Sequence, residues 1–145
     1  MTTISRFDGT AFKFLSNFYP AKVTYEGIEY ATSEHAYQAA KTLDIYQRHN
    51  VAAQPTPAAA KKYGKAVSMR PDWDEVKVRV MEEIVYAKFT QNENLMDMLI
   101  LTEDYELVEG NSWGDTFWGV CDGIGENHLG KTLMRVRDRL NTSKE

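Results

Sequence analysis

The chain contains a single cysteine, Cys121, and no long apolar run among its 145 residues. One cysteine cannot form a disulfide within the chain, and such scarcity is typical of a reducing compartment. No apolar stretch reaches the length of a membrane span, and the N-terminus lacks the basic, apolar and small-residue order of a signal peptide. From these absences we expect a soluble, cytoplasmic protein with no membrane partner.

Strong charge of one sign is also missing. The formal net charge is −4 and the isoelectric point is about 5.4, so no global basic field attracts nucleic acid or membranes. One local exception is a group of basic residues that lie close in the sequence: Lys61, Lys62, Lys65 and Arg70. The favoured interpretation of this group is a solvated helix face, and a basic binding patch is the alternative.

Motifs of several enzyme classes are absent. The sequence holds no Walker loop, no dinucleotide fingerprint and no G-x-S-x-G elbow. The three histidines, His35, His49 and His128, and the cysteine lack the spacing of zinc ligands. We therefore expect neither a metal ion nor a cofactor.

The chain does contain enough apolar material for a packed core. Hydrophobic residues make up 43% and aromatic residues 12%, which argues against disorder, and the length is typical of one domain. We therefore predict a single domain that spans residues 1–145.

Local patterns predict more helix than strand. Residues 23–25 and 28–30 are β-branched and aromatic and flank Glu26-Gly27, which is typical of a β-hairpin. Capping residues and apolar periodicity predict helices at about 34–41, 45–52, 57–64, 73–91, 95–101 and 127–140. Asp72 and Glu75 resemble a capping box for the longest helix. With short strands at 105–108 and 117–120, the predicted fold class is α+β, a predominantly helical domain with a small β-hairpin or sheet.

The helix after the hairpin carries the most informative polar residues. Glu34, Gln38 and Lys41 are spaced by four and three positions, so they lie on one helix face. Thr32 or Ser33 caps the helix start, which leaves amide donors beside the Glu34 carboxylate and favours its ionised form. An ionised acid can activate water or stabilise a sugar cation while a glycosidic bond breaks. Glu34 is therefore the first candidate catalytic residue, with an ordinary helix N-terminal charge as the alternative.

Other polar residues have two interpretations each. Lys41 could bind phosphate or act as an amine nucleophile if burial lowers its pKa, whereas a plain surface lysine is the commoner outcome. Arg70 could pair with phosphate or only with a carboxylate. Asn127 opens the last helix, either as its N-cap or with its amide directed at an anion such as phosphate. Ser16 and Asn17 are polar residues between aromatic ones.

A loop near the C-terminal end combines aromatic residues with glycines. It contains Trp113-Gly114-Asp115 and Phe117-Trp118-Gly119. Indole rings stack on bases, and glycines let the backbone approach a ligand closely. Loop tryptophans can equally fill a small core, so the pattern indicates a base-binding loop or a structural plug.

Read in order, these segments resemble the NADAR superfamily, also called YbiA-like. The resemblance covers nearly the whole chain and depends on these segments: 14–19, Ser33-Glu34-His35 through Gln38 to Lys41, 70–73, 88–92, 107–109, Trp113-Gly114, Trp118-Gly119 and Asn127-x-Leu129-Gly130. It implies an N-glycosidase that hydrolyses the bond between ribose and an exocyclic amine of a base-like ring. The implied substrates are phosphoribosylated intermediates of riboflavin biosynthesis or, as an alternative, ADP-ribosylated guanine in DNA, where such enzymes serve as antitoxins. A non-catalytic module that binds ADP-ribose or NAD is a further alternative.

The resemblance also implies roles for individual residues. Glu34 and Lys41 are the expected catalytic residues, and attack by water and a Schiff base to lysine both remain open. Trp-Gly occurs twice in this chain, so either Trp113 or Trp118 is expected to hold the base. The other expected substrate-binding residues are Ser16, Asn17, His35, Gln38, Arg70, Asp115 and Asn127. The expected partner is a phosphoribosyl or ADP-ribosyl small molecule, or ADP-ribosylated nucleic acid, and the sequence does not predict the oligomeric state.

Overall fold

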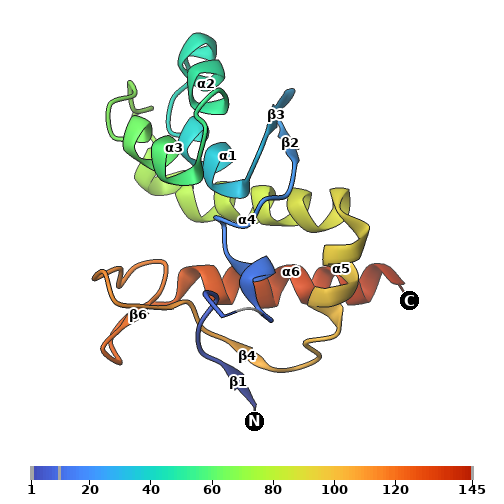
Figure 1. Ribbon diagram of the computed structural model, residues 1–145. Helices are drawn as coiled ribbons and strands as arrows, with labels where there is room; N and C mark the ends of the chain where they lie inside the picture. The colour runs from blue at the N-terminus through green and yellow to red at the C-terminus, as the bar shows by residue number, and fades with distance from the viewer. Residues whose placement is uncertain (1, 10, 145) are drawn as a thin grey trace. The chain divides into compact units, whose positions relative to one another are not determined.

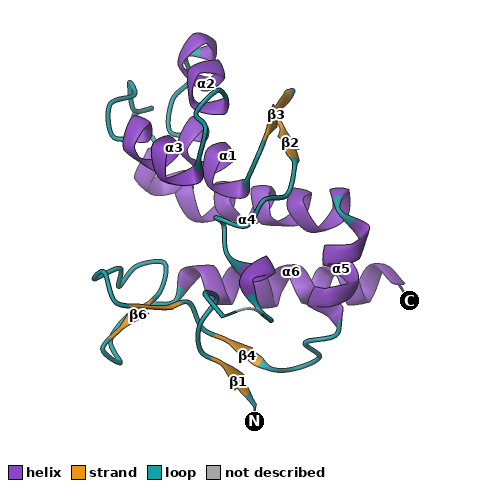
Figure 2. Cartoon of the chain, in the orientation of Figure 1, coloured by secondary structure: helices purple, strands orange, loops and turns teal. Residues whose placement is uncertain are grey.

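The computed structural model describes residues 2–9 and 11–144, and helices dominate this part of the chain (Figures 1 and 2). Its elements are, in order, β1 (Thr3–Ile4), η1 (Lys13–Leu15), β2 (Val23–Tyr25), β3 (Ile28–Tyr30), α1 (Ser33–Ala40), α2 (Ile45–Ala52), α3 (Pro57–Gly64), α4 (Trp73–Gln91), α5 (Glu93–Ile100), β4 (Glu106–Leu107), β5 (Gly110–Asn111), β6 (Val120–Cys121) and α6 (His128–Lys144). The three small sheets have two strands each. The α+β prediction is confirmed. Every helix among the described residues is too short or too polar to cross a membrane.

The chain divides into two compact units, and each is described by itself. Residues 17–92 form one unit, which contains β2, β3 and α1 to α4. Residues 1–16 and 93–145 form the other, which contains the remaining elements. The single domain over residues 1–145 stays a prediction.

The hairpin of the 17–92 unit has the predicted turn. Val23 pairs with Tyr30 and Tyr25 with Ile28 in an antiparallel register. The two turn residues, Glu26 and Gly27, have positive φ angles of 48° and 85°. A type I′ turn requires positive φ at both positions, and its twist matches that of the paired strands. The chain therefore returns sharply and enters α1 directly after β3.

Helix α1 is buried along its entire length. Thr32 is the N-cap, and its side-chain oxygen accepts a hydrogen bond from the amide of His35. All eight residues from Ser33 to Ala40 are buried, because α2, α3, α4 and the hairpin all contact this helix. Small residues permit this close approach. A solvated face, the ordinary expectation for a helix with polar residues, is therefore wrong for α1.

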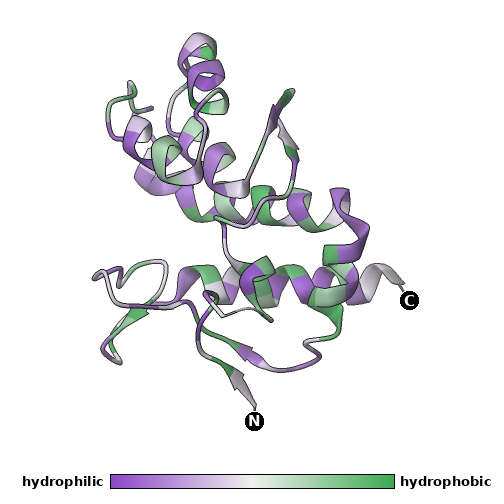
Figure 3. Ribbon diagram, in the orientation of Figure 1, coloured by the Kyte–Doolittle hydropathy of each residue, from purple (hydrophilic) through white to green (hydrophobic). Residues whose placement is uncertain are grey.

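Helix α4 carries a buried apolar stripe, as its periodicity predicts. Val76, Val80 and Ile84 lie on that stripe, and Figure 3 shows apolar and polar turns along the same helix. The predicted capping box is wrong, since the Asp72 side chain makes no capping hydrogen bond. The Asp72 carboxylate instead pairs with the guanidinium of Arg70, with an Nε to Oδ1 distance of 2.7 Å. A charged partner two residues away therefore replaces the backbone amides of the helix start.

The other unit is held together by α6. Strand β1 pairs in parallel with β4, with Ile4 opposite Leu107, and α6 packs on β4 and α5. Its buried residues Leu129, Leu133, Val136 and Leu140 follow the predicted helical spacing. The strand expected at 117–120 is shifted to Val120–Cys121, where it pairs in parallel with β5.

Candidate active site

Glu34 lies in the first turn of α1 with only 8% of its surface exposed. Its backbone amide donates to the carbonyl oxygen of Asn17 at 3.0 Å, which ties the helix start to the preceding segment. The Asn17 side chain accepts a hydrogen bond from the Ser33 hydroxyl at 2.9 Å and donates to the sulfur of Met81 at 3.5 Å. Asn17 and Ser33 therefore fix the backbone from which the carboxylate projects.

Gln38 lies one turn after Glu34 and donates directly to it. The distance from Gln38 Nε2 to Glu34 Oε2 is 2.6 Å, and both side chains are buried. A hydrogen bond from an amide to a carboxylate is short and charge-assisted, and it favours the ionised acid. The predicted pairing of these residues on one helix face is confirmed.

His35 is engaged at both ring nitrogens. Nε2 lies 3.0 Å from the carbonyl oxygen of Gln54, and a carbonyl can only accept, so Nε2 carries the proton. Nδ1 is hydrogen-bonded to the Thr32 hydroxyl at 2.7 Å, and the same hydroxyl oxygen accepts from the His35 amide. The ring therefore connects the cap of α1 to the segment that follows α2.

Lys41 is the C-cap residue of α1 and is partly buried. Its Nζ lies 5.7 Å from the centre of the Tyr37 ring. Burial lowers the pKa of Lys41, Glu34 raises it, and three neighbouring lysines lower it further: Lys61, Lys65 and Lys77. A lysine with a lowered pKa holds more neutral amine near neutral pH, which both nucleophilic attack and proton transfer require.

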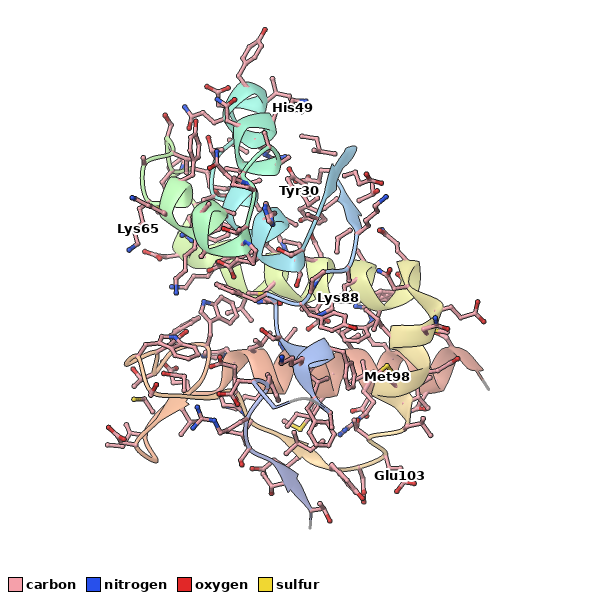
Figure 4. The ribbon with its side chains drawn as sticks, in the orientation of Figure 1. Tyr30, His49, Lys65, Lys88, Met98 and Glu103 are labelled. Atoms are coloured by element: carbon pink, nitrogen blue, oxygen red, sulfur yellow. The ribbon has the colours of Figure 1, made fainter. Side chains whose placement is uncertain are left out.

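The basic residues around this helix end differ in their availability. Lys61 and Lys65 are exposed and lie four residues apart at the end of α3, where Figure 4 marks Lys65. Arg70 lies near the same place, since its amide donates to the Lys41 carbonyl oxygen at 2.7 Å. Its guanidinium forms a two-point ion pair with Asp72, so the carboxylate interpretation of Arg70 describes this structure. The sequence shows that Lys61 and Lys65 are four positions apart. It does not predict that they lie near Lys41, because that proximity depends on the packing of α3 against α1.

In the other unit, Asp115 shapes the aromatic loop. Its Oδ1 accepts from the amides of Phe117 and Trp118 at 3.1 and 2.9 Å, and Asn111 bonds to its backbone on both sides. Trp118 packs edge-on against Phe117, with ring centres 4.9 Å apart. Trp113, by contrast, has 60% of its surface exposed. Trp113 is therefore the indole presented to solvent, and Trp118 is the one packed in the loop.

Asn127 has a positive φ of 56°, and its side chain connects two segments. Its Nδ2 donates to the Leu107 carbonyl oxygen at 2.9 Å, and its Oδ1 accepts from the Glu109 amide at 2.9 Å. Its carbonyl oxygen accepts from the Lys131 amide, so it does begin α6, but its side chain does not cap the helix. Gly130 lies so close that an added Cβ would meet the Leu107 oxygen at 2.0 Å.

The predicted site residues divide between the two units. The 17–92 unit brings together these residues: Asn17, Glu34, His35, Gln38, Lys41 and Arg70. The other unit holds Ser16, at the end of η1, together with Trp113, Asp115, Trp118 and Asn127. Among the described residues, no three His, Cys, Asp or Glu side chains gather closely enough to hold a metal ion.

Comparison with known proteins identifies the family. The model of the NADAR domain family matches residues 6–141. A riboflavin biosynthesis protein of Vibrio vulnificus is 42% identical over 130 residues, which are 88% of this chain but 35% of that protein. N-glycosidase Npun_R5314 of Nostoc punctiforme is 40% identical over 131 residues, which are 86% of this chain and 83% of that one.

A solved structure agrees with these sequence matches. The NMR structure of the Escherichia coli protein YbiA superposes with a TM-score of 0.87 and 32% identity, over 99% of this chain and 87% of that chain. In sequence, N-glycosidase YbiA of E. coli is 36% identical over 132 residues, which are 89% of this chain and 82% of that protein. The chain therefore belongs to the NADAR domain family.

Proposed function

We propose that this chain is an N-glycosidase that hydrolyses the bond between a phosphorylated ribose and an exocyclic amine of a base-like ring. Family membership and the relatives named N-glycosidase and riboflavin biosynthesis protein support this class of reaction and a riboflavin-related substrate. The scarcity of cysteine is consistent with action in the cytoplasm.

The observation that carries the proposal is the placement of Glu34. A carboxylate that is 8% exposed costs free energy unless hydrogen bonds compensate it, and Gln38 supplies one at 2.6 Å. Lys41 follows two turns later with a lowered pKa. A buried acid with an amine nearby is typical of a site that moves protons or stabilises a cation.

Two routes use these groups. In the water route, the C1′–N bond breaks as the leaving amine takes a proton from the Lys41 ammonium, and an oxocarbenium-like centre forms at C1′. Glu34 stabilises that centre and accepts a proton from the attacking water, which yields free ribose phosphate and the free amine. In the lysine route, the neutral amine of Lys41 attacks C1′ and displaces the base-like amine, which leaves with a proton from the attacking lysine. The ribose ring of the glycosyl-lysine then opens at its C1′–O4′ bond to give an imine, and water hydrolyses the imine and restores the lysine.

The lysines at the end of α1 support a phosphorylated substrate. Lys61 and Lys65 are exposed, and Lys77 has a partly buried side chain 3.4 Å from Asp74. Together with Lys41 they concentrate positive charge beside the buried carboxylate, although the whole chain is acidic. A phosphate group is the substrate feature that such a charge distribution favours.

The experiment compares wild type, Glu34→Gln and Lys41→Arg on a phosphoribosylaminopyrimidine and on ADP-ribosylated guanine in a short single strand. Released sugar is measured by mass spectrometry. We expect release from the phosphoribosylaminopyrimidine and loss of at least about 100-fold in Glu34→Gln. Release only from the guanine substrate would assign the chain to the ADP-ribosyl alternative. Silence on both, with ADP-ribose binding retained, would overturn the glycosidase proposal in favour of a binding module.

Controls separate the two routes and the effect of charge. Borohydride added during turnover reduces an imine to a stable amine, so a sugar adduct on Lys41 identifies the lysine route and its absence identifies the water route. Glu75→Gln and Lys22→Arg change exposed residues of the same types. Both are expected to keep wild-type turnover.

A further inference from the structure

The hydrogen bond between Gln38 and Glu34 has one donor orientation. The Gln38 amide presents Nε2 to Glu34 Oε2 at 2.6 Å, since an amide oxygen facing an ionised carboxylate would repel it. The side chain of Gln38 is 3% exposed. The contact is therefore removed from water, where a hydrogen bond to a charge is stronger and more directional.

The other end of the same amide has no hydrogen-bond partner. Gln38 Oε1 is buried and unpartnered among the described residues. A buried acceptor without a donor destabilises the folded chain. Stability alone would favour an apolar residue at this position, so the amide is retained at a cost to the fold. The hydrogen bond that its Nε2 donates to Glu34 explains why an amide occupies this position.

Gly64 determines where this amide can lie. A Cβ atom built on Gly64 would come within 2.0 Å of Gln38 Oε1 and 2.8 Å of its Cδ. Gly64 is the last residue of α3, and α3 packs directly on α1. Its φ lies outside the left-handed region, so the glycine is needed here for space. The sequence pattern had indicated only a helix stop at this position.

We propose that Gln38, seated against Gly64, is a positioning residue that orients the Glu34 carboxylate and keeps it ionised for the reaction. This inference rests on the proposed function. Gln38 then acts through Glu34 and need not contact the substrate. Any side chain at position 64 displaces the amide, because Oε1 and Nε2 belong to one rigid planar group.

Other charges also act on this carboxylate and are common to every variant compared below. The elements packed against it carry these charged and titratable groups: His35, Tyr37 and Lys41 at α1; Tyr46, Arg48 and His49 on α2; Lys61, Lys62, Tyr63 and Lys65 at α3; Asp74, Glu75, Lys77, Arg79, Glu82, Glu83, Tyr86 and Lys88 on α4; and Tyr25, Glu26, Glu29 and Tyr30 in the hairpin. Arg48 is ion-paired with Glu26 at 3.1 Å, and both ring nitrogens of His35 are hydrogen-bonded.

The test replaces the amide while keeping its volume. Gln38→Met has a similar length and no donor, and Gln38→Glu has the same shape but adds a second carboxyl that must share a proton with Glu34. Gln54→Met and Gln54→Glu are the matched controls, since the Gln54 side chain donates to the backbone carbonyl oxygen of Asn50. Carboxyl carbon NMR follows the titration midpoint of Glu34 directly and needs no substrate.

We expect the Glu34 midpoint to move to higher pH in both Gln38 variants and to stay unchanged in both controls. In the plot of kcat against pH, the acidic limb should also move to higher pH in the Gln38 variants. Their kcat should fall about tenfold or more, with a smaller change in KM. An unchanged midpoint in a folded Gln38→Glu protein, checked by circular dichroism, would overturn the inference.

Gly64→Ala tests the same positioning of the Gln38 amide by changing the residue against which it packs. It should displace the amide and reproduce the shift of the Glu34 midpoint, whereas Gly9→Ala should not, because a Cβ on Gly9 meets nothing within 4 Å. A wild-type midpoint in Gly64→Ala would overturn the role of Gly64. Failure of the proposed function is distinguishable, because it appears as no release from either substrate or as wild-type turnover in Glu34→Gln, and the NMR titrations still decide the positioning.

Discussion

Replacing Lys88 with methionine is expected to remove the rise in stability with pH that the titration of Lys88 causes above neutral pH. Lys88 lies on α4 with 1% of its surface exposed, and Figure 4 marks it on that helix. Its Nζ lies 5.9 Å from the centre of the Tyr19 ring and 5.2 Å from that of Phe89. Burial lowers the pKa of Lys88 from 10.5 to about 7, because the ammonium is removed from water.

The sign of the effect follows from proton binding in the two states. Between the two pKa values the unfolded chain holds a proton at Lys88 that the folded chain does not, so the free energy of unfolding rises with pH. The penalty is fully present below the folded pKa of about 7 and is gone above the ordinary pKa of 10.5. One pH unit inside this window corresponds to about 1.4 kcal/mol. From about pH 7 to about pH 9, wild type should therefore gain about 2 kcal/mol from this group.

Urea unfolding at these two pH values measures the gain. Methionine fills similar space without a charge, so Lys88→Met should be more stable than wild type near pH 7, and the difference should shrink towards pH 9. Other titrating groups cancel in the comparison with wild type. Lys22→Met changes an exposed lysine and should leave the wild-type slope intact. Equal pH slopes in wild type and Lys88→Met would refute the assignment of this dependence to Lys88.

Two further predictions concern the aromatic-loop unit and the lysines. Asn127→Ala should lower the free energy of unfolding by about 2–4 kcal/mol, measured by urea unfolding, because it leaves the Leu107 carbonyl and the Glu109 amide without their bonds and retains a positive φ. A loss below about 0.5 kcal/mol would contradict this structural role. Combined replacement of Lys61 and Lys65 by glutamine should raise KM for the phosphorylated substrate about tenfold, or about 1.4 kcal/mol, with little change in kcat. The same variant should leave KM unchanged for the dephosphorylated substrate, and an equal rise for both would contradict phosphate binding.

Local spacing and capping chemistry were enough to predict most elements. The hairpin, the Thr32 cap and the start of α3 at Pro57 each depend on residues close together in the sequence, and each is present. The capping box at Asp72 is wrong for the same local reason, since the adjacent Arg70 competes for the carboxylate. Sequence reasoning thus succeeded where one local interaction dominates and failed where two compete.

Long-range packing could not be read from the sequence. The contact between Gly64 and Gln38 joins residues on different helices, and the Asn127 amide finds Leu107 twenty positions away. Lys88 was also hidden, because an isolated lysine in a helix is normally solvated. These features depend on how helices approach one another. Small residues permit that approach, but they also occur in turns and helix ends, so their presence in the sequence does not predict a particular contact.

The bonding state of each predicted site residue now indicates how it can contribute to the reaction. Both ring nitrogens of His35, Oδ1 of Asp115 and both side-chain polar atoms of Asn127 bond to protein partners, and breaking one such bond to bind a ligand would cost about 1 kcal/mol or more. We therefore expect these side chains to support the site by holding the backbone and neighbouring residues in place. Trp113, whose indole is 60% exposed, can cover a base without breaking a bond. We therefore expect Trp113→Ala to raise KM more than Trp118→Phe, which keeps the packed ring, and the reverse order would make Trp118 the stacking residue.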